Sequence, residues 1–408
     1  MIDVLVCIYF IFLLKRFFFN GIDHFTLFLF GGFYYFIVPI IVGEYWSVFG
    51  MDYFKQWFSI YESLSYDNKL LFVIYVFLLV FLYKLGSVIY SCVFCEGNEV
   101  LTSRFLVERS GLSELSGKYI FLVILLVSSF IWWVSRRYFF SGYSDGYNAS
   151  LMGKMATLEL LILVVFLLMK NKRKIVGKCL FILLMLNGVL LLSMGGRMYV
   201  LLSGIFLFLF FSYGRKMTIR VWGWGGVCSL ILIFVGVVRA DSFSFDKLLY
   251  IALAEPVFTS FSLFSFLSHD ANFNLFSVPY NFINSFVLIF PDFNGYKSQL
   301  ITQVSDMGYS FTSPLGATSF FVSLVGNFGV LGGCIAIFLF SVLVSKLARS
   351  NNLSLRFLFL MLCAIMPFML FRDAFGIVTK VSLFSGFIVP VILLIFNKMT
   401  VFRACVRS

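Results

Sequence analysis

The run LLFVIYVFLLVFLYKLGSVIY, residues 70–90, decides the fold of this chain, because its only charged residue is Lys84. An α-helix rises 1.5 Å per residue and the hydrocarbon core of a bilayer is about 30 Å thick, so about 20 apolar residues in succession suffice to cross it. The length and composition of this run therefore predict a membrane-spanning helix.

Similar apolar runs follow one another along the whole chain, and together they predict about 11 membrane-spanning helices, within a range of 10 to 13. The others occupy residues 2–14, 24–43, 119–135, 155–169, 177–193, 199–213, 221–238, 317–343, 355–371 and 376–397. Of the 408 residues, 61% are hydrophobic and only 12% are charged, against roughly 25% charged in soluble domains. The sequence thus predicts an all-α polytopic membrane protein, with residues 1–408 forming a single integral membrane domain.

The net charge of +12 comes from short basic clusters between the apolar runs. This pattern is typical of topology signals and lipid headgroup contacts, so we expect the lipid bilayer as a partner and no nucleic acid. If the link that holds Lys15 and Arg16 is cytoplasmic and the sides alternate, most of the 31 lysines and arginines lie in the cytoplasm. The N-terminus and the long segment 239–316 then lie outside, and the C-terminus lies inside.

The outside segment 239–316 concentrates the polar chemistry of the chain, with six of the 19 carboxylates and one of the two histidines. It also contains two apolar runs, 248–267 and 273–290, which are interrupted by proline and asparagine. We expect short interfacial or re-entrant helices here, because polar or irregular backbone at membrane depth is tolerated where it lines a protein cavity. A membrane protein with one such segment is expected to carry out its chemistry there.

Arginines stand at the outside ends of several predicted spans, namely Arg136, Arg137, Arg197, Arg239 and Arg372. A guanidinium is always charged and binds phosphate oxygens in pairs, so a cluster of them suits a pyrophosphate. Gly195 and Gly196, just before Arg197, would let backbone N–H groups approach the same anion. The alternative is that each arginine reaches the headgroups or pairs with a nearby carboxylate such as Asp373.

A transfer reaction beside such an anion also needs a group that takes the proton of an acceptor hydroxyl. Glu255 is the preferred candidate because it is embedded in apolar residues, and His269, next to Asp270, is the second. The chain contains no Asp-x-Asp motif and no His/carboxylate cluster, so we expect neither a metal nor another cofactor.

Two short motifs relate the chain to a known family. The segment GYSFTSPLGATSFFVSLVGNFGVLGG, residues 308–333, contains Asn327-Phe328-Gly329 and then Gly332-Gly333, and Gly195-Gly196-Arg197 form a turn in mid-chain. In these motifs, and in the number of spans with one long outside loop, the chain resembles the Wzy-type O-antigen polymerases, which polymerise oligosaccharide repeat units. It departs from many of them at Ala317, where they carry an acidic residue.

The resemblance implies a fold like that of the membrane-embedded C-type glycosyltransferases, in a bacterial inner membrane with the active face in the periplasm. It implies transfer of a growing glycan from undecaprenyl pyrophosphate to another lipid-linked repeat unit, and a chain-length regulator in the membrane as a further partner. The pyrophosphate would then be bound by Arg197, Arg239 and Arg372 with support from Arg136 or Arg137, and Glu255 or His269 would assist deprotonation.

Two other functions stay open. An O-antigen ligase shares this layout, although its outside loop is expected to offer more histidines than His269 alone. A flippase or transporter of lipid-linked oligosaccharides would favour charged residues in mid-helix and internal repeats, and neither is prominent.

Overall fold

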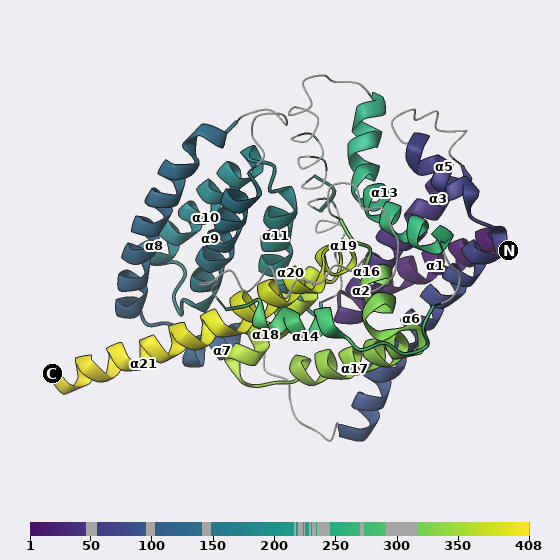
Figure 1. Cartoon of the computed structure of the whole chain (residues 1–408). Helices are drawn as coiled ribbons and strands as arrows, with labels where there is room; N and C mark the ends of the chain where they lie inside the picture. The colour runs from purple at the N-terminus through teal and green to yellow at the C-terminus, as the bar shows by residue number, and fades with distance from the viewer. Residues whose placement is uncertain are drawn as a thin grey trace.

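A computed structural model of the chain describes residues 1–45, 55–94, 103–140, 148–215, 245–269, 273–290 and 317–407, with a few isolated residues between 218 and 234. Within these ranges the regular structure is helical and contains no β-strand, as Figure 1 shows. Seven of the described helices are long and apolar enough to cross a membrane. The chain is therefore consistent with an all-α polytopic membrane protein, and the count of 11 spans stays a prediction.

Helices of the α type alternate with short π- and 3-10 helices, which are labelled η. The first half of the chain forms α1 (Ile2–Lys15), η1 (Arg16–Asn20), α2 (His24–Gly32), η2 (Phe33–Ile37), α3 (Val38–Glu44), α5 (Lys55–Ser63), α6 (Tyr66–Phe94), α7 (Ser103–Ser110), α8 (Glu114–Ser135), η4 (Arg136–Tyr138), α9 (Ala149–Leu168), α10 (Ile175–Ser193) and α11 (Arg197–Ser212). The second half forms α13 (Phe245–His269), α14 (Tyr280–Val287), α16 (Phe320–Phe328), α17 (Val330–Ala348), α18 (Leu353–Ile365), α19 (Met369–Arg372), α20 (Phe375–Thr379), η7 (Lys380–Ile388) and α21 (Val389–Arg407).

Four helices, α8 to α11, stand side by side at the left of Figure 1, with α9 packed against the other three. Short connections join α9 to α10 and α10 to α11, so that consecutive helices run antiparallel. The start of α9 is set by Asn148, whose side chain accepts a hydrogen bond from the backbone N–H of Leu151 at 3.0 Å. α11 also packs on α18, which connects this group of helices to the rest of the molecule.

Small residues allow α6 and α17 to pack closely along one another. A Cβ atom added at Gly86 of α6 would lie 2.7 Å from the carbonyl oxygen of Phe338 in α17. The hydroxyl of Ser341, also in α17, donates a hydrogen bond to the carbonyl of Tyr83. Small residues at such contacts are usual between membrane helices, because lipid and protein are equally apolar and close packing must hold the helices together.

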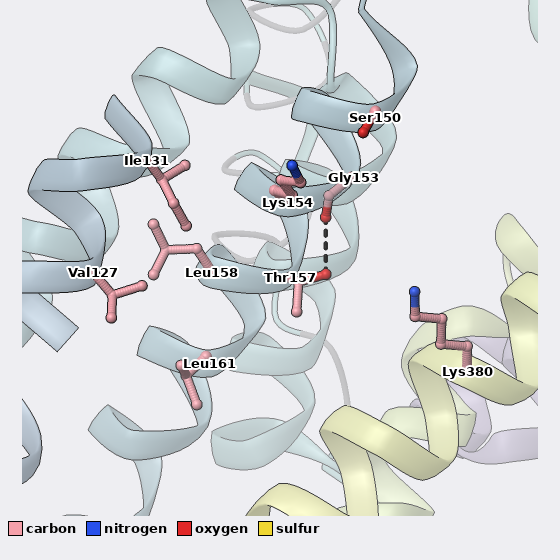
Figure 2. A pocket seen from close by; sticks show the side chains of 9 residues that line it. All are labelled: Val127, Ile131, Ser150, Gly153, Lys154, Thr157, Leu158, Leu161 and Lys380. Carbon is pink, nitrogen blue, oxygen red and sulfur yellow. Dashed lines mark hydrogen bonds between the residues drawn. The ribbon is translucent and has the colours of Figure 1, made fainter. Parts of the chain in front are cut away.

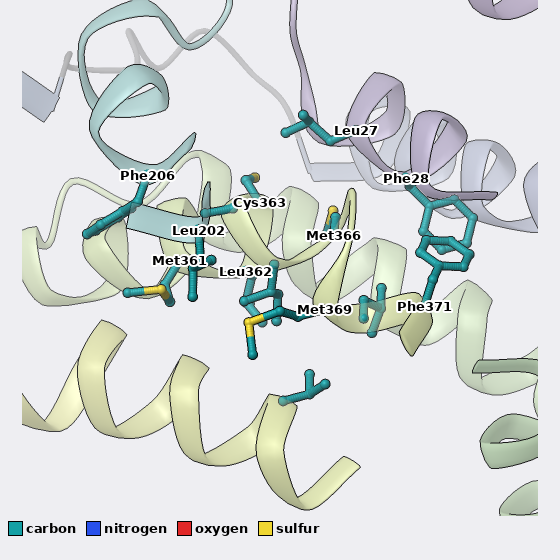
Figure 3. Close-up of a cluster of buried hydrophobic side chains, with 14 of the residues drawn as sticks. Leu27, Phe28, Leu202, Phe206, Met361, Leu362, Cys363, Met366, Met369 and Phe371 are labelled. Carbon is teal, nitrogen blue, oxygen red and sulfur yellow. The ribbon is translucent and has the colours of Figure 1, made fainter. Parts of the chain in front are cut away.

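The apolar core centres on α18, where most side chains are buried. Figure 3 shows side chains from α2, α11, α18 and α19 packed around this helix. The rings of Phe28 in α2 and Phe371 in α19 lie 5.3 Å apart, and both side chains are buried. Because Phe371 is held in the core, the position of the next residue, Arg372, is determined by core packing.

The predicted span at 317–343 is wrong as a single helix, because the chain breaks at Gly329 between α16 and α17. Gly329 has φ +76°, and an added Cβ atom would lie 2.6 Å from the carbonyl oxygen of Leu275. The carbonyls of Asn274 and Leu275 accept hydrogen bonds of 3.0 Å from the backbone N–H groups of Val330 and Leu331. The carbonyls of the segment that follows α13 thus cap the start of α17. This segment can approach so closely because residue 329 is a glycine, which has no Cβ atom.

The apolar run 248–267 also differs from the short interfacial helix expected for it. It lies within α13, a helix of 25 residues that packs against α3, α5, η2 and α16. Its second half is buried in the helical body, including Val257, Phe261, Leu263, Phe264 and Phe266. The run 273–290 does form a short helix, α14, of eight residues with only Ser285 buried.

Candidate functional site

Glu255 is positioned by an irregularity in α13. The next residue, Pro256, lies inside the helix and has no backbone N–H, so the carbonyl of Ala252 four residues earlier lacks its helical donor. The hydroxyl of Tyr34, in η2, donates a hydrogen bond to this carbonyl at 3.1 Å. This bond joins η2 to α13 within one turn of Glu255 and therefore fixes where the carboxylate lies.

Arg372, the last residue of α19, forms an ion pair with Glu255, with 3.1 Å between Nε and Oε2. The two side chains are 27% and 28% exposed, so the pair lies at the edge of the helical body and is open to solvent or a ligand. The backbone carbonyl of Arg372 accepts a hydrogen bond from Thr318 N–H at 3.1 Å, just before α16 begins. The backbone near each residue of the pair is thus held by a hydrogen bond, at Ala252 for Glu255 and at Arg372 itself.

The hydroxyl of Tyr35, beside this pair, is a buried donor with no hydrogen-bond acceptor within the described part of the chain. The Nε of Arg372 is also buried, and the carboxylate of Glu255 lies 3.1 Å from it. Tyr35 is in η2, only 1% exposed, and interacts electrostatically with Arg372. Since buried polar groups nearly always have a partner, the hydroxyl of Tyr35 is suited to an oxygen atom of a bound anion.

Arg197, the first residue of α11, belongs to the same group. Its charge acts on the phenol of Tyr34 together with the charges of Glu255 and Arg372. Tyr199, two residues further along α11, interacts electrostatically with Arg372. The fold thus brings Glu255 and Arg372 into contact and places Arg197 within electrostatic range of the same tyrosine, from three helices that are far apart along the chain.

Asp373 also belongs to this group. From the sequence, its only expected role was to pair with an arginine. Burial raises the pKa of Asp373 to about 6, against the effect of Arg372, which lowers the pKa, while Glu255 raises it further. The pKa of Arg372 is itself raised, because Glu255 and Asp373 together outweigh the opposing effect of burial. The charge of the site therefore changes near pH 6.

Arg136 and Arg137 are exposed and belong to η4, at the end of α8. The guanidinium groups lie 4.9 Å and 4.8 Å from the ring centres of Trp133 and Tyr138, respectively. Tyr138 packs in the same small apolar cluster as Tyr199, which places this end of α8 near the start of α11. No described contact brings either arginine to Glu255.

The expectation that Gly195 and Gly196 offer N–H groups to an anion is wrong. Their N–H groups donate to the carbonyls of Leu192 and Leu191, at 3.0 Å and 2.9 Å, and so complete the end of α10. Gly195 has φ +94°, which explains the glycine by the geometry of the turn. Arg197 is thus carried at the start of α11 by a turn that has a structural role.

Two predicted site residues cannot be placed. Arg239 lies outside the described residues, and His269 is the last residue of α13, with a side chain that is likewise outside them. Their roles stay predictions. Within the described ranges, no group of three His, Cys, Asp or Glu side chains is arranged to hold a metal ion.

A pocket of about 580 Å³ lies between α8, α9 and η7, and Figure 2 shows its lining. It is lined by Val127, Ile131, Ser150, Gly153, Lys154, Thr157, Leu158, Leu161 and Lys380. Sequence reasoning missed both lysines. The sequence contained a signal for this pocket. Small and polar residues recur every three or four positions on one face of the predicted helix, namely Ser150, Gly153, Lys154 and Thr157.

Glu159 in α9 was also missed, although it lies inside a predicted span. Its side chain is 3% exposed and accepts a hydrogen bond of 2.8 Å from Nδ2 of Asn187 in α10. The indole N–H of Trp132 in α8 donates to Oδ1 of the same Asn187 at 2.9 Å. A carboxyl group buried among membrane helices is costly and is therefore a candidate for a functional role.

Comparison of the chain with protein-family models, with curated proteins and with solved structures gives no match. The group formed by Arg197, Glu255, Arg372 and Asp373 is therefore the basis on which a function is inferred.

Proposed function

We propose that the protein is a glycosyltransferase of a bacterial inner membrane, which polymerises undecaprenyl-pyrophosphate-linked repeat units of O-antigen or a related surface polysaccharide. The bond between the anomeric carbon of the growing glycan and its pyrophosphate breaks, and a bond to a hydroxyl of the next lipid-linked unit forms. Undecaprenyl pyrophosphate leaves with the bonding electrons, and the hydroxyl loses its proton. The ion pair of Glu255 and Arg372, with Arg197 nearby, is the observation that carries the proposal.

The arginines serve the leaving group. Negative charge grows on the pyrophosphate oxygens as the glycosidic bond breaks, and fixed positive groups stabilise that charge best in a site sheltered from water. Arg372 offers a guanidinium group that already faces the carboxylate of Glu255, and Tyr35 offers a hydroxyl without an acceptor in the described part of the chain. Arg197 adds a second guanidinium, and two such groups suit a pyrophosphate in charge.

Glu255 serves the acceptor. A pyrophosphate that binds Arg372 competes with the carboxylate of Glu255. Binding of the lipid-linked glycan through its pyrophosphate therefore releases that carboxylate from its ion pair. A released carboxylate within reach of the acceptor hydroxyl can take its proton. His269 stays the alternative base, and Arg239 a further candidate for the pyrophosphate.

The experiment uses a strain from which this gene is deleted, complemented with variants, and separates its surface polysaccharide by electrophoresis. Arg197→Ala and Arg372→Ala should remain in the membrane but replace the ladder of chain lengths by single repeat units. Arg173→Ala is the matched control, because Arg173 is an exposed arginine in the connection between α9 and α10. Normal ladders from both site variants would overturn the assigned site. Long lipid-linked polymer that is never transferred to the lipid A core would identify a ligase instead.

A flippase for lipid-linked oligosaccharides is the second candidate, and the buried carboxyl group of Glu159 favours it. Ionisable groups among membrane helices are frequent in proton-coupled transporters. The same deletion strain separates the two functions, because loss of a flippase leaves no repeat units on the core, whereas loss of a polymerase leaves single units. Glu159→Gln, which keeps an acceptor for Asn187, should reproduce the deletion only if proton transfer at Glu159 is required.

A further inference from the structure

The pocket between α8, α9 and η7 combines two charged groups with an apolar wall. Figure 2 shows Val127 and Ile131 of α8 on one side of the view, Lys154 on α9 in the middle and Lys380 on η7 on the other side. Both lysines are exposed side chains within helices long and apolar enough to span a membrane. They lie about one turn from the starts of these helices, a depth at which the headgroups of the bilayer give way to lipid chains.

The charge in this pocket is not balanced by the described protein groups. None of the described lining residues is a carboxylate, and in the described part of the chain neither Lys154 nor Lys380 forms an ion pair. A lysine alone near a helix end can extend to the headgroups without a specific ligand. Lys154 and Lys380 come from different helices and line one pocket, so both ammonium groups are available to a shared anion there, with the hydroxyl of Ser150 in the same lining. The hydroxyl of Thr157 donates to the carbonyl of Gly153 at 2.8 Å.

The remaining wall suits a hydrocarbon chain. The pocket follows α9 from Ser150 to Leu161, which corresponds to roughly 16 Å of helix. Its apolar side chains are Val127, Ile131, Leu158 and Leu161. Gly153 faces open space, because a Cβ atom added there would meet no other atom within 4 Å.

We propose that this pocket binds the phosphate group of an anionic lipid between Lys154 and Lys380, with the lipid chain along the apolar wall formed by α8 and α9. A polyprenyl phosphate and an anionic phospholipid share this chemistry. The proposal does not depend on the proposed transferase, since a lipid phosphate would occupy the site whatever reaction the protein catalyses. If the protein is that transferase, the pocket holds a lipid phosphate separate from the group around Arg372.

The test measures lipid binding to the purified full-length protein in detergent by native mass spectrometry. The probes are undecaprenyl phosphate, phosphatidylglycerol and, as a zwitterionic reference, phosphatidylcholine. The double variant Lys154→Ala/Lys380→Ala should weaken binding of the anionic lipid by about tenfold or more, as expected when two charged hydrogen-bond donors are removed. Gly153→Phe, which leaves both charges in place but fills the pocket, should do the same.

Two matched controls separate a built site from general attraction of anions. Lys178→Ala/Lys398→Ala removes the same charge from two exposed lysines of α10 and α21. Gly204→Phe places the same ring on an exposed glycine of α11 that is equally free of neighbours. Both controls should bind anionic lipid like the unaltered protein. Equal losses in the controls, or unchanged binding in the pocket variants, would overturn the proposal.

Competition distinguishes the two sources of the phosphate. If undecaprenyl phosphate stays bound in the presence of excess phosphatidylglycerol, the pocket is selective for the polyprenyl lipid. If phosphatidylglycerol displaces it, the pocket holds a phospholipid of the bilayer. The readout is binding and not glycan length, so it stands even when the transferase proposal fails.

Discussion

The Nε atom of Arg372 lies 3.1 Å from Oε2 of Glu255, which joins the end of α19 to the middle of α13. The two residues are 117 positions apart in the chain, and each is close to an element that the apolar core holds in place. An anion that binds Arg372 must displace or share this carboxylate. The pair thus connects binding of a negatively charged ligand to the availability of a base.

Glu255→Gln should separate these two effects. Without the competing charge, the purified variant should bind inorganic pyrophosphate more tightly, by about tenfold if the carboxylate competes fully. Polymerisation should nevertheless fall, because the amide cannot take a proton. Calorimetric titration and the glycan ladder measure the two properties independently. Tighter binding with a normal ladder would assign Glu255 to charge balance alone and leave His269 as the candidate base.

Anion binding should strengthen on acidification through Asp373. Burial raises the pKa of this carboxyl to about 6, so it is mostly charged at pH 7.5 and mostly neutral at pH 5. Protonation removes one negative charge beside Arg372 and favours an anion there. Sulfate is a suitable probe because its own charge is constant over this range. Asp373→Asn should bind sulfate at pH 7.5 as the unaltered protein does at pH 5, and should show a much weaker pH dependence.

Tyr34→Phe should destabilise the protein by removing the only described donor to the carbonyl of Ala252. The expected loss is about 0.5–1.5 kcal/mol, the usual contribution of one such hydrogen bond. In a Pro256→Ala background the same change should cost less, because the introduced alanine supplies the helical N–H that proline lacks. Thermal unfolding of the four proteins in detergent gives the comparison. Equal losses in both backgrounds would show that Tyr34 does not compensate for the proline.

Gly329→Ala should be among the most destabilising single substitutions in the chain. The backbone at Gly329, with φ +76° and ψ 176°, lies in a region that is open essentially only to glycine and costs other residues about 1–3 kcal/mol. The added Cβ atom would also press on the backbone of Leu275. Gly204→Ala, on an open surface of α11, is the control and should be neutral or slightly stabilising. Similar melting temperatures for the two variants would contradict the account of the break.

The sequence by itself determined the class of fold and the position of most helices. The apolar run 70–90 appears within α6, and the runs at 119–135, 155–169 and 177–193 appear as α8, α9 and α10. This succeeds because the thickness of a bilayer sets a length of apolar sequence that can be counted directly. The sequence also singled out Glu255, Arg197 and Arg372, since charged groups are rare among so many apolar residues.

Only the tertiary structure decided what these residues contact. The break at Gly329 depends on the carbonyls of Asn274 and Leu275, which lie more than 50 residues earlier. No local sequence pattern predicts this contact. The pocket with Lys154 and Lys380 likewise exists only because η7 packs on α9. Helices form from local periodicity and burial, whereas the pairing of distant side chains follows from how whole helices pack, and that information is spread over the entire chain.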